Sequence, residues 1–293
     1  DRLELSLYWP EDVEPDLKSA LQDVENALRE RPDAEQHKLT SAKHYLADKT
    51  NSGLVFNALS QHIAGLYNSR PGLRWALQQT PRALMIADVD IEQPIVRSLQ
   101  QTLSTLYTSA PKALPTPNSW RAASQHIRRQ DKGYNTLLAS ELSQNSNRQN
   151  ILDLMSYFTL RQRLSLLGQH SDVAYRLVRQ PLYNFGYQAL HLFRARELSN
   201  AELDTLLTHL TAPVSDVELE TIAQRLIEEY EKLLEDDARR HSLYSKKHFY
   251  NLAMLSLDEY SELVETIEPS ALSAQISQSL ARNNAIIISM QPD

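Results

Sequence analysis

The chain has 293 residues, a net charge of −7, six glycines, thirteen prolines and no cysteine, and its 47 leucines outnumber the 23 isoleucines and valines. This composition excludes collagen-like, disulfide-framework and low-complexity disordered proteins. It also argues against a doubly wound α/β enzyme, which needs Val/Ile-rich buried strands and glycines at its turns, and predicts a soluble, mostly helical protein.

Helix starts are the clearest signals along the chain. Prolines stand where a first helical turn tolerates a missing N–H, at Pro15, Pro71, Pro81 and Pro269. Three Ser-x-x-Glu sequences read as capping boxes, in which the two side chains satisfy free N–H groups of the first turn: Ser199–Glu202, Ser215–Glu218 and Ser256–Glu259. Apolar residues recur at helical spacing over 17–28, 54–66, 95–106, 151–167, 203–210 and 219–234. Together these patterns predict about a dozen helices.

A proline-rich segment divides the chain. Residues 109–119 hold three prolines within seven residues, and such a sequence cannot continue a helix. It separates an expected N-terminal helical region, residues 1–110, from a C-terminal helical region, residues 118–293, unless both belong to one continuous helical array. Only Ala285–Ser289 favours a β-strand, and we interpret it as a docked tail.

Consecutive helices joined by short turns predict antiparallel hairpins. In the segment Leu164–Tyr175, a helix ending near Gly168 precedes a cap at Ser171 and the small residue Ala174. This turn resembles that of tetratricopeptide-type (TPR) helical hairpins, and residues 151–210 are similar to uncharacterised all-helical bacterial envelope proteins. The expected fold class is therefore all-α: antiparallel helix hairpins stacked as an irregular, TPR-like α-solenoid, or a multi-helix bundle.

Charge is segregated along the chain. Residues 1–35 carry a net −7, residues 36–115 +4, residues 116–196 +7 and residues 197–293 −11. The basic block is almost all arginine: Arg121, Arg128, Arg129, Arg148, Arg161, Arg163, Arg176, Arg179, Arg194 and Arg196. Because arginine recognises carboxylate and phosphate in a bidentate manner, the block is either a groove for an anionic ligand or partner, or a set of charges paired internally with the acidic helices.

Signatures of common enzymes are absent from the sequence. It contains no His-Glu-x-x-His, no Glu-x-x-His, no Gly-x-Ser-x-Gly and no glycine-rich phosphate loop, and it has no thiol. The pairs His37/His44 and His241/His248 are two helical turns apart, too far to share one ion without further ligands. We therefore expect no metal, no cofactor and no catalytic residue, and with a pI near 5.7 no nucleic-acid partner.

The best candidate ligand site is a stripe along a helix expected around Pro181, which should kink it. Arg and aromatic residues recur there every three or four positions: Arg176, Arg179, Tyr183, Tyr187, His191 and Arg194. Tyr157 and Arg161, one turn apart on the preceding helix, would face this stripe. The kinked helix would form a pocket wall, and the alternative is ordinary packing of tyrosines with arginines reaching the surface.

The leading functional hypothesis is a non-enzymatic binding or scaffold module that presents this Arg/Tyr surface to a protein or a small anionic ligand. The alternative is an all-helical enzyme acting on an anionic substrate, with His191 as acid/base and Arg176 and Arg179 as clamps; a purely structural domain is a third. A cysteine-free chain favours an extracytoplasmic location, in the periplasm or envelope, over a cytoplasmic one. Because the sequence starts at Asp1, a signal, anchor or tag is expected upstream, and an anchor would be the only membrane contact.

Overall fold

The computed structural model describes residues 19, 54–56, 58–59, 62, 97, 120–129, 133–142, 146–168, 173–181, 186–194, 196–249 and 252–292. The chain forms two compact units, one made of residues 1–45 and 68–116 and the other of residues 46–67 and 117–293. In the first unit the described residues are Ser19 and Arg97, both helical and exposed. The second unit carries the rest of the described structure.

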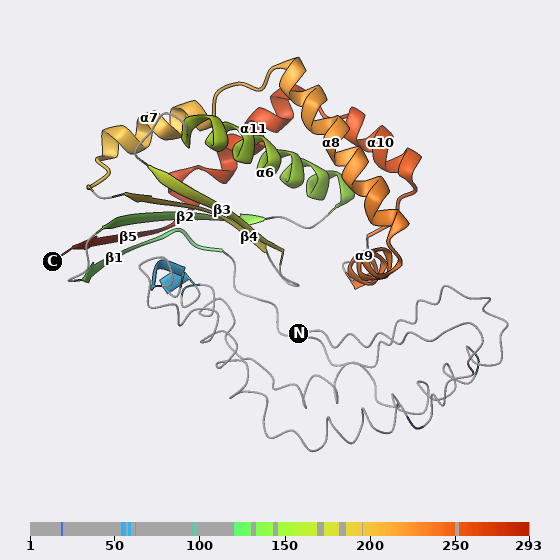
Figure 1. Ribbon diagram of the computed structural model, residues 1–293, viewed down its shortest axis with the longest axis horizontal. Coiled ribbons are helices and arrows are strands. Elements are labelled where there is room, and N and C mark those ends of the chain that lie inside the picture. Colours follow the sequence, from blue (N-terminus) through green and yellow to red (C-terminus); the bar gives the residue numbers. More distant parts are fainter. Residues whose placement is uncertain are drawn as a thin grey trace. The chain divides into compact units, whose positions relative to one another are not determined.

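A five-stranded mixed sheet organises the second unit (Figure 1). Its strands are β1 (Ala123–Arg129), β2 (Tyr134–Leu142), β3 (Ala174–Pro181), β4 (Gly186–Arg194) and β5 (Ile286–Pro292), in the spatial order β1-β5-β2-β4-β3. β1 runs parallel to β5, whereas the β5–β2, β2–β4 and β4–β3 pairs are antiparallel. The last strand in the sequence therefore lies inside the sheet, between β1 and β2.

Helices cover one face of this sheet, as Figure 1 shows. They are α6 (Asn147–Gly168), α7 (Asn200–Leu210), α8 (Asp216–Glu235), α10 (Leu257–Glu265) and α11 (Pro269–Ser279), which is followed by a short 3₁₀ turn at Arg282–Asn284. A further helix, α9 (Asp237–Phe249), follows α8 and packs on it. α6 packs on β3 and α11 on β2, and α8 and α10 pack on α6. A large apolar core fills this layer and includes Leu138, Met155, Leu190, Ile222 and Leu272.

The opposite face of the sheet has its own apolar core. In the segment 54–62, the described residues 54–56, 58–59 and 62 are helical, and Val55, Ala58 and Leu59 lie buried against side chains of β2, β4 and β5. The strand residues in this core are Leu137, Ala139, Ala189, Ile286, Ile288 and Met290. The central strands are therefore buried on both faces.

The all-α prediction is wrong, for both the TPR-like α-solenoid and the helix bundle. β2 and β4 are covered on both faces, so their sequences lack the apolar–polar alternation that reveals a half-buried strand. Pro181 ends β3 opposite Gly186 in a hairpin and does not kink a helix, which suits proline because β3 is an edge strand. The resemblance to a TPR turn fails because the helix up to Gly168 is followed by β3.

The predicted helix starts that lie among the described residues agree better with the structure. Ser199 and Ser256 cap α7 and α10 with complete capping boxes, and Ser215 caps α8 through the Glu218 N–H. Pro269 begins α11 in its first turn. Ala285–Ser289 does contain strand residues, but β5 is a central strand and not a docked tail.

Candidate functional site

The predicted Arg/Tyr stripe lies on the β3–β4 hairpin, where alternation sends its members to opposite faces. Arg176 and His191 are register partners on the face away from α6, and Tyr187 packs on the core of that same face. Arg179 lies on the other face, next to Asp153 and Tyr157 of α6. The hairpin therefore splits the stripe, and Tyr183 lies outside the described residues.

His191 is part of an aromatic cluster on the face away from α6. Its ring is fully buried, with centroids 5.6 Å from Phe56 and 5.6 Å from Phe193, and its Nε2 lies 2.9 Å from Asn135 Oδ1. The Arg176 guanidinium lies 5.6 Å from the centre of the Phe56 ring. Burial, with a smaller contribution from the Arg176 charge, lowers the pKa of His191 to about 4. A neutral, enclosed imidazole does not suit the acid/base role predicted for it.

A second group of polar side chains lies buried between α6 and the sheet. We call it the polar seam, and it comprises Ser140, Asp153, Ser156, Arg179 and Gln188. Asp153 Oδ1 accepts hydrogen bonds from Gln149 Nε2 (3.0 Å) and Gln275 Nε2 (2.7 Å). Burial raises the pKa of Asp153 to about 6, and Gln149 and the Arg179 charge oppose that rise.

The polar seam is poorly satisfied within the described structure. Asp153 Oδ2, the Ser140 and Ser156 hydroxyls, Arg179 Nε and both amide atoms of Gln188 have no hydrogen-bond partner among the described residues. Burial also lowers the pKa of Arg179, and Asp153 opposes this most. Four members of the seam are buried and Arg179 is half-buried, so we assign the seam to the interior and not to a binding surface.

Other arginines of the basic block are paired internally. Arg163 of α6 binds Glu218 through two nitrogens, at 2.9 and 2.7 Å. Arg194 donates to Glu202 at 2.8 Å, and the exposed Arg196 also pairs with Glu202. Hydrogen bonds from Ser199, then from Arg194, lower the pKa of Glu202 to about 2.

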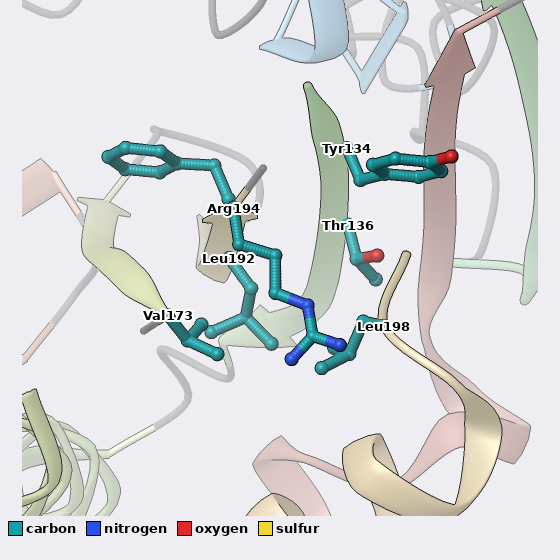
Figure 2. A pocket seen from close by; sticks show the side chains of 7 residues that line it. Tyr134, Thr136, Val173, Leu192, Arg194 and Leu198 are labelled. Atoms are coloured by element: carbon teal, nitrogen blue, oxygen red, sulfur yellow. The ribbon is translucent and has the colours of Figure 1, made fainter. Parts of the chain in front are cut away.

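Figure 2 shows the small pocket beside Arg194, at the end of the sheet next to α7. The pocket is lined by Tyr134, Thr136, Val173, Leu192, Phe193, Arg194 and Leu198. Its walls are mostly apolar, and the one cation in its lining is already bound to Glu202. The pocket therefore offers no free charge for the anionic ligand that the sequence predicted.

Five arginines of the block are exposed and make no ion pair within the described part of the chain: Arg121, Arg128, Arg148, Arg161 and Arg176. Arg161 was predicted to face the stripe together with Tyr157; Tyr157 is half-buried and Arg161 points to the exposed side of α6. Each reading of the basic block thus applies to different members, since Arg163, Arg194 and Arg196 are paired and these five make no ion pair among the described residues.

The β1 edge was missed by the sequence reasoning. Along β1, Ala123, Gln125 and Ile127 are half-buried, whereas Ser124, His126 and Arg128 are exposed. Gln125 Oε1 lies 2.9 Å from Nε2 of His62, so the first set faces the helical residues 54–62. The sequence over 123–128 gave only a weak strand signal, because Gln125 interrupts the apolar–polar alternation and Ile127 is its only large apolar residue.

The described residues contain neither a metal-binding cluster nor a membrane-spanning helix. No group of three His, Asp or Glu side chains in that part of the chain is placed to hold a metal ion. Among the same residues, no helix is both long and apolar enough to cross a bilayer.

Comparison with known proteins identifies the fold. No protein-family model and no curated protein matches the chain. Among solved structures it is similar to a peptidase M16 inactive domain from Pseudomonas fluorescens (14% identity, TM-score 0.53, 67% of this chain and 50% of that one). A protease from Helicobacter pylori has 14% identity and a TM-score of 0.52, and the match covers 69% of this chain and 53% of that one. A chain of complex III2 from Candida albicans has 12% identity and a TM-score of 0.50, and the match covers 66% of this chain and 52% of that one.

The chain thus spans about half the length of these solved chains. Identities this low support a shared fold and nothing finer, and the fold occurs in protease structures and in complex III2 alike. This finding overturns both functional hypotheses drawn from the sequence, the TPR-like helical binding module and the all-helical enzyme. The described unit has the mixed α/β fold of M16 peptidase-like domains.

Proposed function

We propose that this chain is a non-catalytic, peptidase-like domain that binds extended polypeptide without cleaving it. The observation that carries the proposal is the combination of an M16 peptidase-like sheet with an edge at β1 that pairs with no strand among the described residues. An open strand edge offers a row of backbone donors and acceptors, which is how many domains bind extended chains.

Two further observations support the absence of peptidase chemistry. The zinc-peptidase motifs His-Glu-x-x-His and His-x-x-Glu-His are both missing from the 293 residues. The described residues hold no cluster of three metal-ligating side chains, so those present do not fit a catalytic zinc ion. The similarity to an M16 domain described as inactive is in keeping with this.

The test measures binding and cleavage together. The purified chain is applied to an array of short immobilised peptides of varied sequence, and the same peptides are incubated with it in solution with added Zn²⁺. We expect binding to a subset of peptides and no fragments by mass spectrometry. Fragments that disappear with a chelator would show a metallopeptidase, and an array without any bound peptide would refute polypeptide binding.

We further propose that the protein works outside the cytoplasm. The support is its lack of cysteine, since the oxidising envelope favours chains without free thiols. Fractionation of the native cells with an antibody against the chain should place it with periplasmic or envelope markers. Recovery with cytoplasmic markers would refute this proposal without affecting the proposed binding activity.

A further inference from the structure

We infer that the exposed edge of β1 takes an acidic, extended peptide as an added strand, with carboxylates at alternate positions lying beside His126 and Arg128. This inference rests on the proposed function, because it names the class of polypeptide that the domain would hold. Its support comes from the backbone of β1, from the exposed charges on it, and from the way its two faces differ.

The backbone of β1 leaves alternate residues free to pair. β1 is parallel to β5, and the Ala123 N–H donates to Ala285 O at 3.2 Å. In a parallel ladder, a residue that bonds one neighbour turns both its N–H and its C=O toward that neighbour, and the next residue turns both away. The backbone groups of Ser124, His126 and Arg128 therefore point to the open edge, where no described strand pairs with them.

The exposed side chains along this edge are basic. His126 and Arg128 are exposed, Arg121 lies just before the strand, and residues 120–129 include no acidic residue. Arg121 and Arg128 make no ion pair within the described structure. One carboxylate does lie nearby, because Glu197 accepts a hydrogen bond from Gln291, the register partner of Arg128, at 3.0 Å. It does not pair with Arg128, whose guanidinium has no carboxylate partner among the described residues and can meet one from a ligand.

The two faces of β1 define a sequence pattern for the ligand. Neighbouring residues of paired strands place their side chains on the same face, within contact distance. Side chains beside Ser124, His126 and Arg128 would be acidic, and those beside Ala123 and Ile127 would extend the apolar core formed with residues 54–62. The expected pattern is apolar–acidic–apolar–acidic. A second copy of the chain fits poorly, because it would bring two basic edges together.

The first experiment uses peptides and leaves the protein unchanged. The probe is fluorescein-labelled acetyl-Ser-Val-Glu-Val-Glu-Val-Ser-amide, and binding to the complete chain is followed by fluorescence anisotropy. The control replaces both Glu residues with Lys and should not bind. Two further probes carry N-methyl groups on the Val residues or on the Glu residues. An added strand uses only alternate N–H groups toward its neighbour, so one methylated probe should lose binding and the other keep it.

The second experiment changes the edge. Arg128→Glu replaces attraction by repulsion and should weaken binding of the acidic probe roughly three- to tenfold, and less at high salt. The matched control is Arg148→Glu, an exposed arginine on α6 that is also without an ion pair in the described structure, and it should leave affinity unchanged. Circular dichroism checks that both variants fold. If Arg128→Glu does not fold, the methylated probes still test the inference on the unchanged protein.

Each outcome bears on the inference. Equal binding of the acidic and Lys probes, equal effects of both methylation patterns, or equal effects of the two arginine variants would each overturn it. If the acidic probe fails while other peptides on the array still bind, the β1 inference falls and the proposed function stands. If no peptide binds at all, both fall together.

Discussion

Two buried titratable side chains lie on opposite faces of the sheet and respond to pH in opposite directions. The pKa of Asp153 rises from 3.8 to about 6, and the pKa of His191 falls from 6.5 to about 4. Between pH 4 and 6 the folded protein therefore holds an extra proton on Asp153 and lacks one on His191, relative to the unfolded chain. Acidification through this window adds stability through Asp153 and removes it through His191, by roughly 3 kcal/mol each at full extent.

Single variants should separate these two contributions. Asp153→Asn keeps an oxygen for Gln149 and Gln275, and it removes the group that gains stability from protonation. The wild type gains stability through Asp153 as the pH falls from 7 to 5, and Asp153→Asn lacks this gain. Over that interval its unfolding free energy should fall by roughly 1 kcal/mol relative to that of the wild type. The wild type loses stability through His191 over the same interval, and His191→Gln lacks this loss. Its unfolding free energy should therefore rise by about 2 kcal/mol relative to that of the wild type.

Urea unfolding at both pH values measures these differences. Comparing each variant with the wild type cancels the contribution of other carboxylates such as Glu202. A change of the same sign in both variants would contradict the assignment of opposite shifts to Asp153 and His191.

At the scale of elements, the sequence reveals structure that depends on neighbouring residues, and it does not reveal structure that depends on pairing between distant segments. Helix caps such as Ser199 and Ser256 act within one turn, so the sequence alone predicts α7 and α10. β4 pairs with β2 about fifty residues earlier in the chain and is buried on both faces. Its Tyr187, His191 and Arg194 also fall at helical spacing, which explains why a helix was predicted there.

The candidate site shows the same limit. Which arginines of the basic block are free depends on pairing across long distances in the sequence, as between Arg163 and Glu218 or Arg194 and Glu202. The sequence identified the basic block but not its free members. No clear sequence pattern distinguishes the exposed residues of β1. The strand was identified as an edge strand only from the strand order of the sheet.

Arg163 joins three elements through a single side chain. Besides its two bonds to Glu218 at the start of α8, its Nη1 donates to Leu210 O and Ala212 O, each at 2.7 Å. These bonds satisfy carbonyls at the end of α7 and hold the α7–α8 turn on α6. Few other side chains could do this, because only the guanidinium has enough donors in a fixed plane.

Arg163→Lys should therefore destabilise the fold by about 2 kcal/mol, since lysine cannot bridge the carboxylate and both carbonyls. The control is Arg239→Lys, whose side chain is 70% exposed and pairs only with Asp236, and it should change stability by less than about 0.5 kcal/mol. Thermal and chemical unfolding compare the two. Equal effects would show that the Arg163 network is not stabilising.

The whole unit depends on a segment remote in sequence, because residues 54–62 cover the sheet face that α6–α11 leave open. Leu59 is fully buried there, and Trp120 lies in the same apolar core. Leu59→Ala should cost about 2–5 kcal/mol, as expected for a leucine deleted from a packed core. Leu166→Ala, at a leucine on α6 that is 58% exposed, should change stability by less than about 0.5 kcal/mol.

Urea unfolding followed by tryptophan fluorescence measures both variants, and Trp120 lies within the affected core. If Leu59→Ala were as mild as Leu166→Ala, the segment 54–62 would not be an integral part of this unit. The sequence did predict a helix there from its apolar spacing, but not that it would cover a sheet.

The central position of β5 governs when the protein can fold during synthesis. Trp120, beside the start of β1, donates to Asn284 O, 164 residues further along the chain. At ordinary translation rates, β1 emerges from the ribosome roughly 10 to 30 s before its neighbour in the sheet. Contacts this far apart in sequence also close slowly. The apolar side chains of the segment 54–62, β1 and β2 therefore stay uncovered until β5 has been synthesised. During that interval the growing chain is most prone to aggregation.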